Sequence, residues 1–218
     1  MPSHVIDTIA SVFTAIGTVA VAILAIWGDQ IKDRLLGPRL GLSLVSAKGD
    51  LTLRGDGSKV YYYHLRVTNQ KGRNAARGTR AVMQAFARRA PSGRFVISPL
   101  VYPLQLVWTP FEPGETERLV TDESFCDLGY VGEFEKIFRL AAIATPNNFS
   151  GSVEKDACVR YELVAIGQNV LSRKPVVLEV SWDGQWTENQ EEMQRHLVIR
   201  EISVQEGTPS DPEPDPDF

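Results

Sequence analysis

The sequence has few of the residues that form crosslinks or redox sites. Its 218 residues include only two cysteines, Cys126 and Cys158, which lie far apart and form no C-x-x-C pair. The spacing therefore indicates neither a zinc site nor a redox motif, and buried free thiols are the expected state. A disulfide between the two cysteines is the alternative, and it would need an oxidising compartment.

Histidine is scarce too, and no catalytic motif accompanies it. The chain has His4 at its start, His64 in a strand-like run and His196 after a short helical segment. A metal site formed by His64, His196 and Glu192 is one alternative, and ordinary surface or partly buried histidines are the other. The sequence has no G-x-S-x-G, phosphate-binding loop or dinucleotide fingerprint. We therefore expect a non-enzymatic protein with no catalytic, cofactor-binding or metal-binding residues.

Charge is missing altogether from the segment between Thr8 and Gly28. This segment has about the 20 residues that a helix needs to cross a bilayer, and Trp27 lies where an interfacial aromatic anchor is expected. The apolar helical pattern continues to Leu36 and ends at the Gly37-Pro38 pair. We therefore predict that residues 1–37 form one transmembrane helix with a juxtamembrane extension of about two turns.

Lys and Arg are also missing from the residues before this segment, whereas Lys32, Arg34 and Arg39 follow it. The absence of an N-terminal positive charge argues against a cleaved signal peptide, for which the small residues at 20–22 would supply a cleavage site. The same asymmetry predicts the orientation by the positive-inside rule. We expect a single-pass protein of the cell membrane, with its N-terminus outside and its β domain in the cytoplasm.

Small side chains recur along one face of the predicted helix. They follow an i, i+4 spacing with further small residues alongside, and a groove of this kind lets a second helix approach closely. The alternative is that small residues are simply common in a weakly apolar span. The residues predicted to pack against another membrane helix are Ala10, Ser11, Thr14, Ala15, Thr18 and Ala22.

Helical periodicity is nearly absent after Pro38. Short runs of β-branched, aromatic and aliphatic residues alternate there with Gly, Pro, Asn and Asp clusters, which is typical of an antiparallel β-sandwich. One short helix is expected near Thr187–Arg195, and a hairpin turn at Arg54–Ser58. The predicted domain covers residues 38–204, with strands at Leu40–Ala47, Lys59–Asn69, Thr79–Arg88, Leu104–Trp108, Thr116–Thr121, Ile137–Ala144, Val159–Ile166, Val176–Trp182 and Leu197–Val204.

The stretch HLRVTNQKGRNAARGTRAVM resembles the pattern between two strands of bacterial immunoglobulin-like modules. In that pattern a strand ends in Val-x-Asn and is followed by a glycine turn and a small alanine. Val67, Asn69, Gly72 and either Ala75 or Ala76 occupy these positions. The later run YELVAIGQNVLSRKPVVLEVSWDGQW is similar to uncharacterised membrane-anchored bacterial proteins with such sandwiches. The resemblance implies an immunoglobulin-like β-sandwich and no particular activity.

Acidic residues are missing between Asp56 and Glu112, and then dominate up to Glu135. This distribution predicts an electrically bipolar domain, with a basic surface for anionic lipid head groups or an acidic partner. No nucleic acid is expected, because the whole chain is acidic and offers no recognition helix. Pairing of the two charged segments across a sheet is the alternative. The residues predicted to form the basic surface are Lys71, Arg73, Arg77, Arg80, Arg88 and Arg89.

Two tryptophans and the C-terminal tail complete the features of interest. Trp182 and Trp186 flank an Asp-Gly-Gln turn, and Trp186 is a candidate interface anchor. Alternatively, Trp182 belongs to the core and Trp186 only caps the turn. Residues 205–218 are acidic and rich in proline, and are therefore predicted to be a disordered tail.

Together these features predict a non-enzymatic single-pass membrane subunit without cofactors. Its helix is expected to pack against other membrane helices, while its β domain scaffolds or stabilises a larger membrane protein complex. The alternative is a membrane-anchored sensor or effector whose β domain binds a small ligand in a concave pocket.

Overall fold

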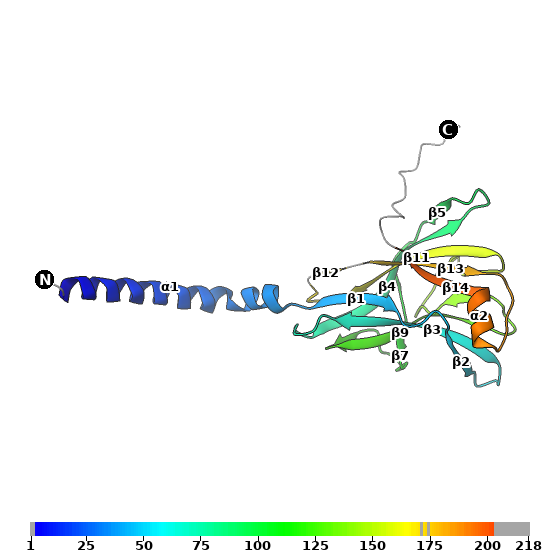
Figure 1. Cartoon of the computed structure of the whole chain (residues 1–218), viewed down its shortest axis with the longest axis horizontal. Coiled ribbons are helices and arrows are strands. Elements are labelled where there is room, and N and C mark those ends of the chain that lie inside the picture. Colours follow the sequence, from blue (N-terminus) through cyan, green and yellow to red (C-terminus); the bar gives the residue numbers. More distant parts are fainter. Residues whose placement is uncertain (1–2, 171, 174, 203–218) are drawn as a thin grey trace, which may run out of the picture.

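The computed structural model describes residues 3–170, 172–173 and 175–202. It consists of a long N-terminal helix, α1 (Ser3–Leu36), and a β domain at the C-terminal end of that helix (Figure 1). The tail predicted at 205–218 lies outside the described residues, as do the last two residues of the strand predicted to end at Val204.

Helix α1 projects away from the β domain (Figure 1). Its segment Ser11–Gly28 is long and apolar enough to cross a membrane, and the domain buries none of it. The helix continues beyond this segment to Leu36, and Gly37 and Pro38 are then buried at the edge of the domain. The predicted helix and its extension beyond the apolar segment are therefore confirmed as a helix.

The strands of the domain form two sheets. The first sheet has the order β10-β9-β3-β1-β12, with β2 paired to β3 and β7 paired to β9. Its pairings are antiparallel except for a short parallel pairing of β1 with β12. The strand bounds are β1 Arg39–Leu44, β2 Asp50–Leu53, β3 Lys59–Asn69, β7 Trp108–Thr109, β9 Glu123–Gly132, β10 Phe138–Leu140 and β12 Ser172–Arg173.

The second sheet has the order β14-β13-β11-β4-β5, with β6 and β8 also paired to β4. All of its pairings are antiparallel. The short helix α2 (Gln190–His196) leads directly into its last strand. The strand bounds are β4 Ala76–Arg89, β5 Phe95–Ser98, β6 Leu104–Gln105, β8 Arg118–Val120, β11 Ala157–Ile166, β13 Val176–Trp182 and β14 Leu197–Ile202.

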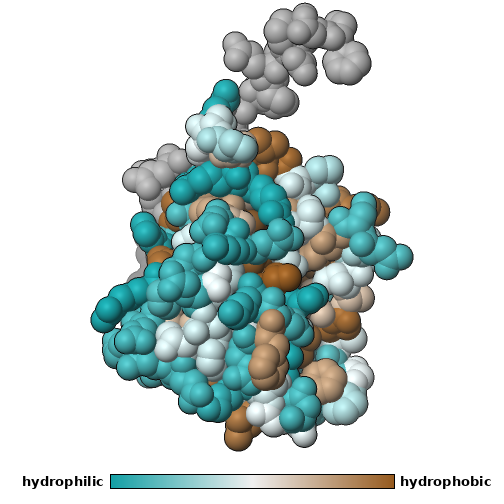
Figure 2. All heavy atoms as spheres, turned by 90° about the vertical axis from the view of Figure 1, so that its right-hand side faces the viewer, coloured by the Kyte–Doolittle hydropathy of each residue, from teal (hydrophilic) through white to brown (hydrophobic). Residues whose placement is uncertain are grey.

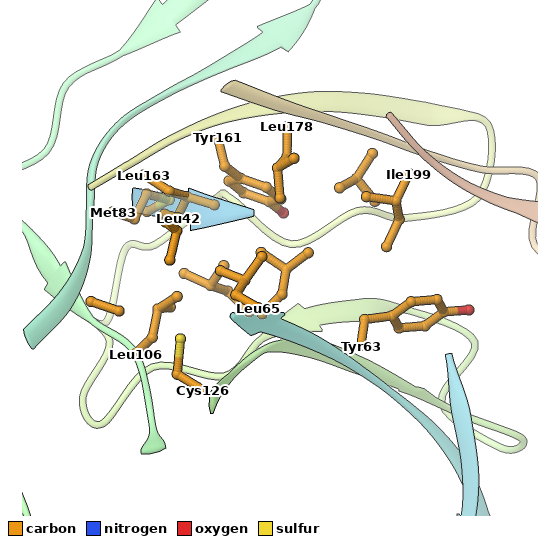
Figure 3. Packing of buried hydrophobic residues seen from close by; sticks show 14 of the residues in the cluster. Leu42, Tyr63, Leu65, Met83, Leu106, Cys126, Tyr161, Leu163, Leu178 and Ile199 are labelled. Atoms are coloured by element: carbon orange, nitrogen blue, oxygen red, sulfur yellow. The ribbon is translucent and has the colours of Figure 1, made fainter. Parts of the chain in front are cut away.

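One hydrophobic core fills the space between the two sheets (Figure 3). It forms because apolar residues alternate along the strands, so that each sheet turns one apolar face inward. On β3, for example, Tyr63, Leu65 and Val67 are fully buried, and on β13 the same holds for Leu178 and Val180. These residues belong to a single cluster, to which both sheets contribute.

Two local predictions are confirmed, one of them with a shifted start. The Arg54–Ser58 segment is a hairpin turn in which the Gly57 amide donates to the Arg54 carbonyl at 2.9 Å. Helix α2 begins three residues later than predicted, because the Asn189 side chain caps it. The Asn189 carboxamide oxygen accepts the amides of the first turn, which fixes the start of the helix.

Candidate functional site

The junction between α1 and the β domain fixes the position of the helix relative to the domain. The turn between β3 and β4 lies against the last turn of α1. The Asn74 amide donates to the Leu36 carbonyl at 2.7 Å, and the Arg73 guanidinium donates to the Leu35 carbonyl. These bonds satisfy two carbonyls that the end of a helix leaves without partners. The helix is therefore attached to the domain by more than the peptide chain.

Asn69, at the end of β3, holds this junction together from inside the domain. Its side chain is buried, and its Oδ1 accepts the Arg39 amide at 3.2 Å. Its Nδ2 donates to the Asn74 carbonyl at 2.8 Å and to the Thr121 carbonyl at 3.2 Å. One side chain thus joins the start of β1, the β3–β4 turn and the residue after β8. A buried amide that satisfies this many backbone groups is costly to remove.

Four cations lie around this junction, and we call them the junction cations: Arg39, Lys71, Arg73 and Arg77. Lys71 and Arg73 belong to the β3–β4 turn, whereas Arg39 opens β1 and Arg77 lies at the start of β4. Arg39, Lys71 and Arg77 are exposed. In the described part of the chain, no carboxylate forms an ion pair with any of the four. The junction therefore carries positive charge that the domain itself does not neutralise.

The other residues of the predicted basic surface have partners inside the domain. Arg88 donates to the carbonyls of Ser150 and Ser152, at 3.0 and 2.7 Å. Arg89 lies 3.7 Å from the Glu179 carboxylate. Of the six predicted residues, only Lys71, Arg73 and Arg77 belong to the junction. The six residues therefore do not lie in one cluster, because β4 carries its arginines from one end of the domain to the other.

The basic and acidic segments of the sequence lie side by side instead of at opposite poles. The acidic strand β9 pairs along β3, and β8 pairs with β4. As a result Arg66 lies 4.0 Å from Glu123, and Arg80 lies 3.8 Å from Glu117. The alternative of charge pairing across the sheets therefore describes this part of the domain better than a bipolar surface.

The predicted helix-packing face lies along the part of α1 that projects from the domain. Ser11, Thr14, Ala15, Thr18 and Ala22 are exposed, and the Thr18 hydroxyl donates to the Thr14 carbonyl at 2.9 Å. Ala10 lies in the same helix, but its side chain is outside the described ones. Trp27, the predicted interfacial anchor, is 49% exposed near the end of the apolar segment. The described side chains of this face are thus left uncovered by the β domain.

The two tryptophans of the Asp-Gly-Gln turn pack differently. Trp182 is fully in the core, and its indole N–H donates to the Lys136 carbonyl at 2.8 Å. Trp186, the candidate interface anchor, is half-buried against the core, with its ring centroid 5.9 Å from that of Tyr61. Its indole ring therefore covers Tyr61 in the manner of a turn cap, as the alternative proposed, and offers only part of its surface to a partner.

His64 lies in a group of titratable side chains. Its Nδ1 lies 2.7 Å from a carboxylate oxygen of Asp127, and its Nε2 lies 3.3 Å from Asp50. The Thr109 hydroxyl donates to the same oxygen of Asp127. The hydrogen bond to Asp127 raises the pKa of His64, and this gain exceeds the opposing effect of partial burial. The group links β2, β3 and β9 on the first sheet.

The raised pKa of His64 makes the stability of the protein depend on pH. Protonated His64 stabilises the folded state fully below its unfolded-state pKa of 6.5, and this contribution is lost as pH rises through the raised folded-state pKa. We expect the free energy of unfolding of the full-length protein in detergent to fall by about 1 kcal/mol between about pH 6 and pH 8.5. Denaturant titrations at several pH values measure this change.

Two substitutions distinguish the contributions of Asp127 and Asp50 to the raised pKa of His64. Asp127→Asn is expected to remove most of the pH dependence, because the hydrogen bond from this residue is the largest cause of the raised pKa. Asp50→Asn should remove less of the pH dependence, because the Asp50 carboxylate acts on His64 only through its charge. An unchanged pH dependence in Asp127→Asn would show that another group is responsible.

An open depression of about 500 Å³ lies at the end of the domain far from α1. It is the nearest counterpart of the concave pocket that the ligand-binding alternative requires. Several of its charged groups have partners within the domain, since His196 lies 2.7 Å from Asp183 and Arg89 lies beside Glu179. The face of the domain seen from this end is mostly hydrophilic, with hydrophobic residues in small separate spots (Figure 2). Residues lining the depression include Arg89, Cys158, Trp182, Asp183, Arg195 and His196.

The cysteines are free thiols on different sheets, Cys126 on β9 and Cys158 on β11, and both are buried. Burial raises the pKa of each thiol, so both stay protonated and unreactive near neutral pH. Within the described ranges, no three His, Cys, Asp or Glu side chains lie together in a way that could hold a metal ion. His64 and His196 each face their own carboxylates instead of each other.

Comparisons with protein-family models, with curated proteins and with solved structures gave no match to this chain. The function is therefore inferred from the arrangement of the described residues.

Proposed function

We propose that this chain is a non-enzymatic, single-pass membrane subunit. In this proposal α1 crosses the membrane and packs against other membrane helices, while the β domain scaffolds or stabilises a larger membrane protein complex. The observation that carries the proposal is the junction. An apolar helix that the domain leaves uncovered is attached to it by hydrogen bonds from Asn74 and Arg73. Because of this attachment, the position of the helix in the membrane determines the position of the domain outside the membrane.

The small residues of α1 support the helix-packing part of the proposal. In a bilayer, helices associate through close packing and hydrogen bonds, because lipid tails are as apolar as the helices themselves. A face of Ser, Thr and Ala side chains permits such an approach, and in α1 this face is exposed. Trp27 would then lie at the level of the head groups and fix the depth of the helix.

We further infer an immunoglobulin-like sandwich and a cytoplasmic orientation. The properties of four residues of the suggested strand-turn-strand pattern support the sandwich. Val67 and Ala76 are fully buried, Asn69 organises the junction, and Gly72 has a φ of +77° in the β3–β4 turn. The orientation follows from the Lys and Arg residues on the C-terminal flank of the apolar segment.

Co-purification of partner proteins tests the proposed function, and α1 offers a matched pair of variants. Ala22 lies on the small-residue face, whereas Ala20 lies about 160° away around the helix. Ala22→Leu is expected to lower the stoichiometric yield of partner proteins several-fold, because the larger side chain keeps a second helix at a distance. Ala20→Leu should leave the yield unchanged. Quantitative mass spectrometry of the full-length protein, purified in a mild detergent from its native membrane, measures both.

Two results would count against the proposal. Purification of the unmodified chain alone, or only with copies of itself, would remove the basis for a subunit of a larger complex. Equal losses in both variants would show that α1 does not use its small-residue face for packing.

A further inference from the structure

We propose that the junction cations bind the anionic lipid head groups of the leaflet from which α1 emerges. The proposal rests on the proposed function in one respect, namely that α1 crosses a membrane. It adds a specific partner for Arg39, Lys71, Arg73 and Arg77. This partner is a negatively charged lipid surface, on which the domain rests beside its own helix.

The length of α1 sets the distance between the junction and the membrane. The apolar segment ends at Gly28, and the helix continues to Leu36, eight residues further. At 1.5 Å per residue this extension is about 12 Å long. The head-group layer on each side of a bilayer is about 5 to 7 Å thick. The end of α1 and the β3–β4 turn bound to it therefore lie about 5 to 7 Å beyond the head groups, within the Debye length of about 8 Å at physiological ionic strength.

The junction cations outnumber the carboxylates at this end of the domain, where Asp122 follows β8 and its carbonyl accepts the Asn69 amide. The helix extension from Asp29 to Leu36 contains Lys32 and Arg34, but also Asp29 and Asp33, so its formal charges cancel. The junction cations, in contrast, lack carboxylate partners within the described part of the domain, and three of the four are exposed. A membrane with anionic lipids is the surface that lies closest to them and has the opposite charge.

The junction also keeps the cations in place. The β3–β4 turn that carries Lys71 and Arg73 is bound to α1 through Asn74, and the turn is held from inside by Asn69. The Arg77 amide donates to the Asn169 side chain at 2.9 Å, which fixes the start of β4. Because the cations are fixed relative to the helix axis, insertion of α1 brings all four to the leaflet together. No separate folding or docking step is then needed.

Lipid selectivity measured by spin-label electron spin resonance tests the proposal. The full-length protein is reconstituted in phosphatidylcholine vesicles with spin-labelled phosphatidylserine or spin-labelled phosphatidylcholine as the probe. We expect phosphatidylserine to associate with the unmodified protein several-fold more strongly than phosphatidylcholine, since each cation near the surface contributes up to about fivefold in binding. Salt at about 0.5 M should reduce this preference by screening.

The double variant Lys71→Glu/Arg77→Glu is expected to lose most of the preference for phosphatidylserine. The matched control is Arg94→Glu/Lys155→Glu, which makes the same change of net charge at exposed positions of the loops before β5 and β11. These loops lie at the end of the domain far from the junction, so the control should keep the preference. Circular dichroism and thermal unfolding of both variants establish that each is folded.

The outcomes separate this proposal from the proposed function. Resistance of the vesicle-bound protein to alkaline carbonate extraction reports insertion of α1, and it does not depend on the junction cations. An inserted double variant that loses no more selectivity than the control would overturn the lipid proposal alone. A chain that carbonate removes from the vesicles would overturn the membrane-spanning role, and the lipid proposal with it.

Discussion

Replacing Gly129 by alanine is expected to lower the free energy of unfolding by about 3 kcal/mol. Gly129 lies in β9 between β3 and β10, and both neighbouring strands fix its backbone. A Cβ atom at this position would lie 2.4 Å from the Arg139 carbonyl oxygen and 2.5 Å from the Phe138 ring. Real Cβ atoms essentially never come this close to another heavy atom. The sheet would have to open locally, because a paired backbone carbonyl cannot move away alone.

Gly132 provides the matched control in the same strand. A Cβ atom there would meet only the Arg54 guanidinium, at 3.8 Å, which is ordinary van der Waals contact. Gly132→Ala is therefore expected to change the stability by less than about 0.5 kcal/mol. Denaturant unfolding of the full-length protein in detergent, followed by the fluorescence of buried Trp108 and Trp182, measures both variants. Equal stability of the two variants would mean that β9 and β10 do not approach as closely as described.

Strands with regular alternation could be predicted from the sequence with little error. β3 and β13 have the predicted bounds, and in both the inward residues are apolar while the outward ones are mostly polar. β11 is also found where predicted but begins two residues earlier, and β14 begins at Leu197 as predicted. The local pattern is sufficient in these strands, because one face of each strand meets the core and the other does not.

The prediction omitted β9, although it is one of the longer strands and pairs along most of β3. Its sequence contains Asp127, Gly129 and Gly132, which are residue types that strands usually disfavour. Each has a role that only the folded structure provides. Asp127 binds His64, and Gly129 allows the close approach of β10. The acidic composition of this segment therefore indicated a charged surface, whereas the fold uses it as a central strand.

The candidate site could be predicted in part. The excess of positive charge identified Lys71, Arg73 and Arg77, but it could not separate them from Arg88 and Arg89. That separation depends on the length and direction of β4, which carries the second pair away from the junction. The sequence places Arg39 after the helix, and only the fold brings it beside the β3–β4 turn. A charge count along the chain contains no information about which cations share one end of a domain.

Asn69→Ala is expected to destabilise the protein by about 3 kcal/mol and to loosen the junction. The Arg39 amide and the carbonyls of Asn74 and Thr121 would each lose a partner in a partly buried position. Asn148→Ala, in an exposed loop, is the control and should cost less than about 0.5 kcal/mol.

Amide hydrogen exchange distinguishes a loosened junction from a general loss of stability. Relative to the unmodified protein, Asn69→Ala should accelerate the exchange of the Arg39 and Asn74 amides more than that of the amides at the centre of β11. The reason is that local opening of the junction then needs less free energy than global unfolding. Uniform acceleration across the domain would contradict a specific role of Asn69 at the junction. If the opening is local, the same variant should also weaken the lipid preference of the junction cations. Their alignment with the membrane depends on the β3–β4 turn, and Asn69 holds that turn against the end of α1.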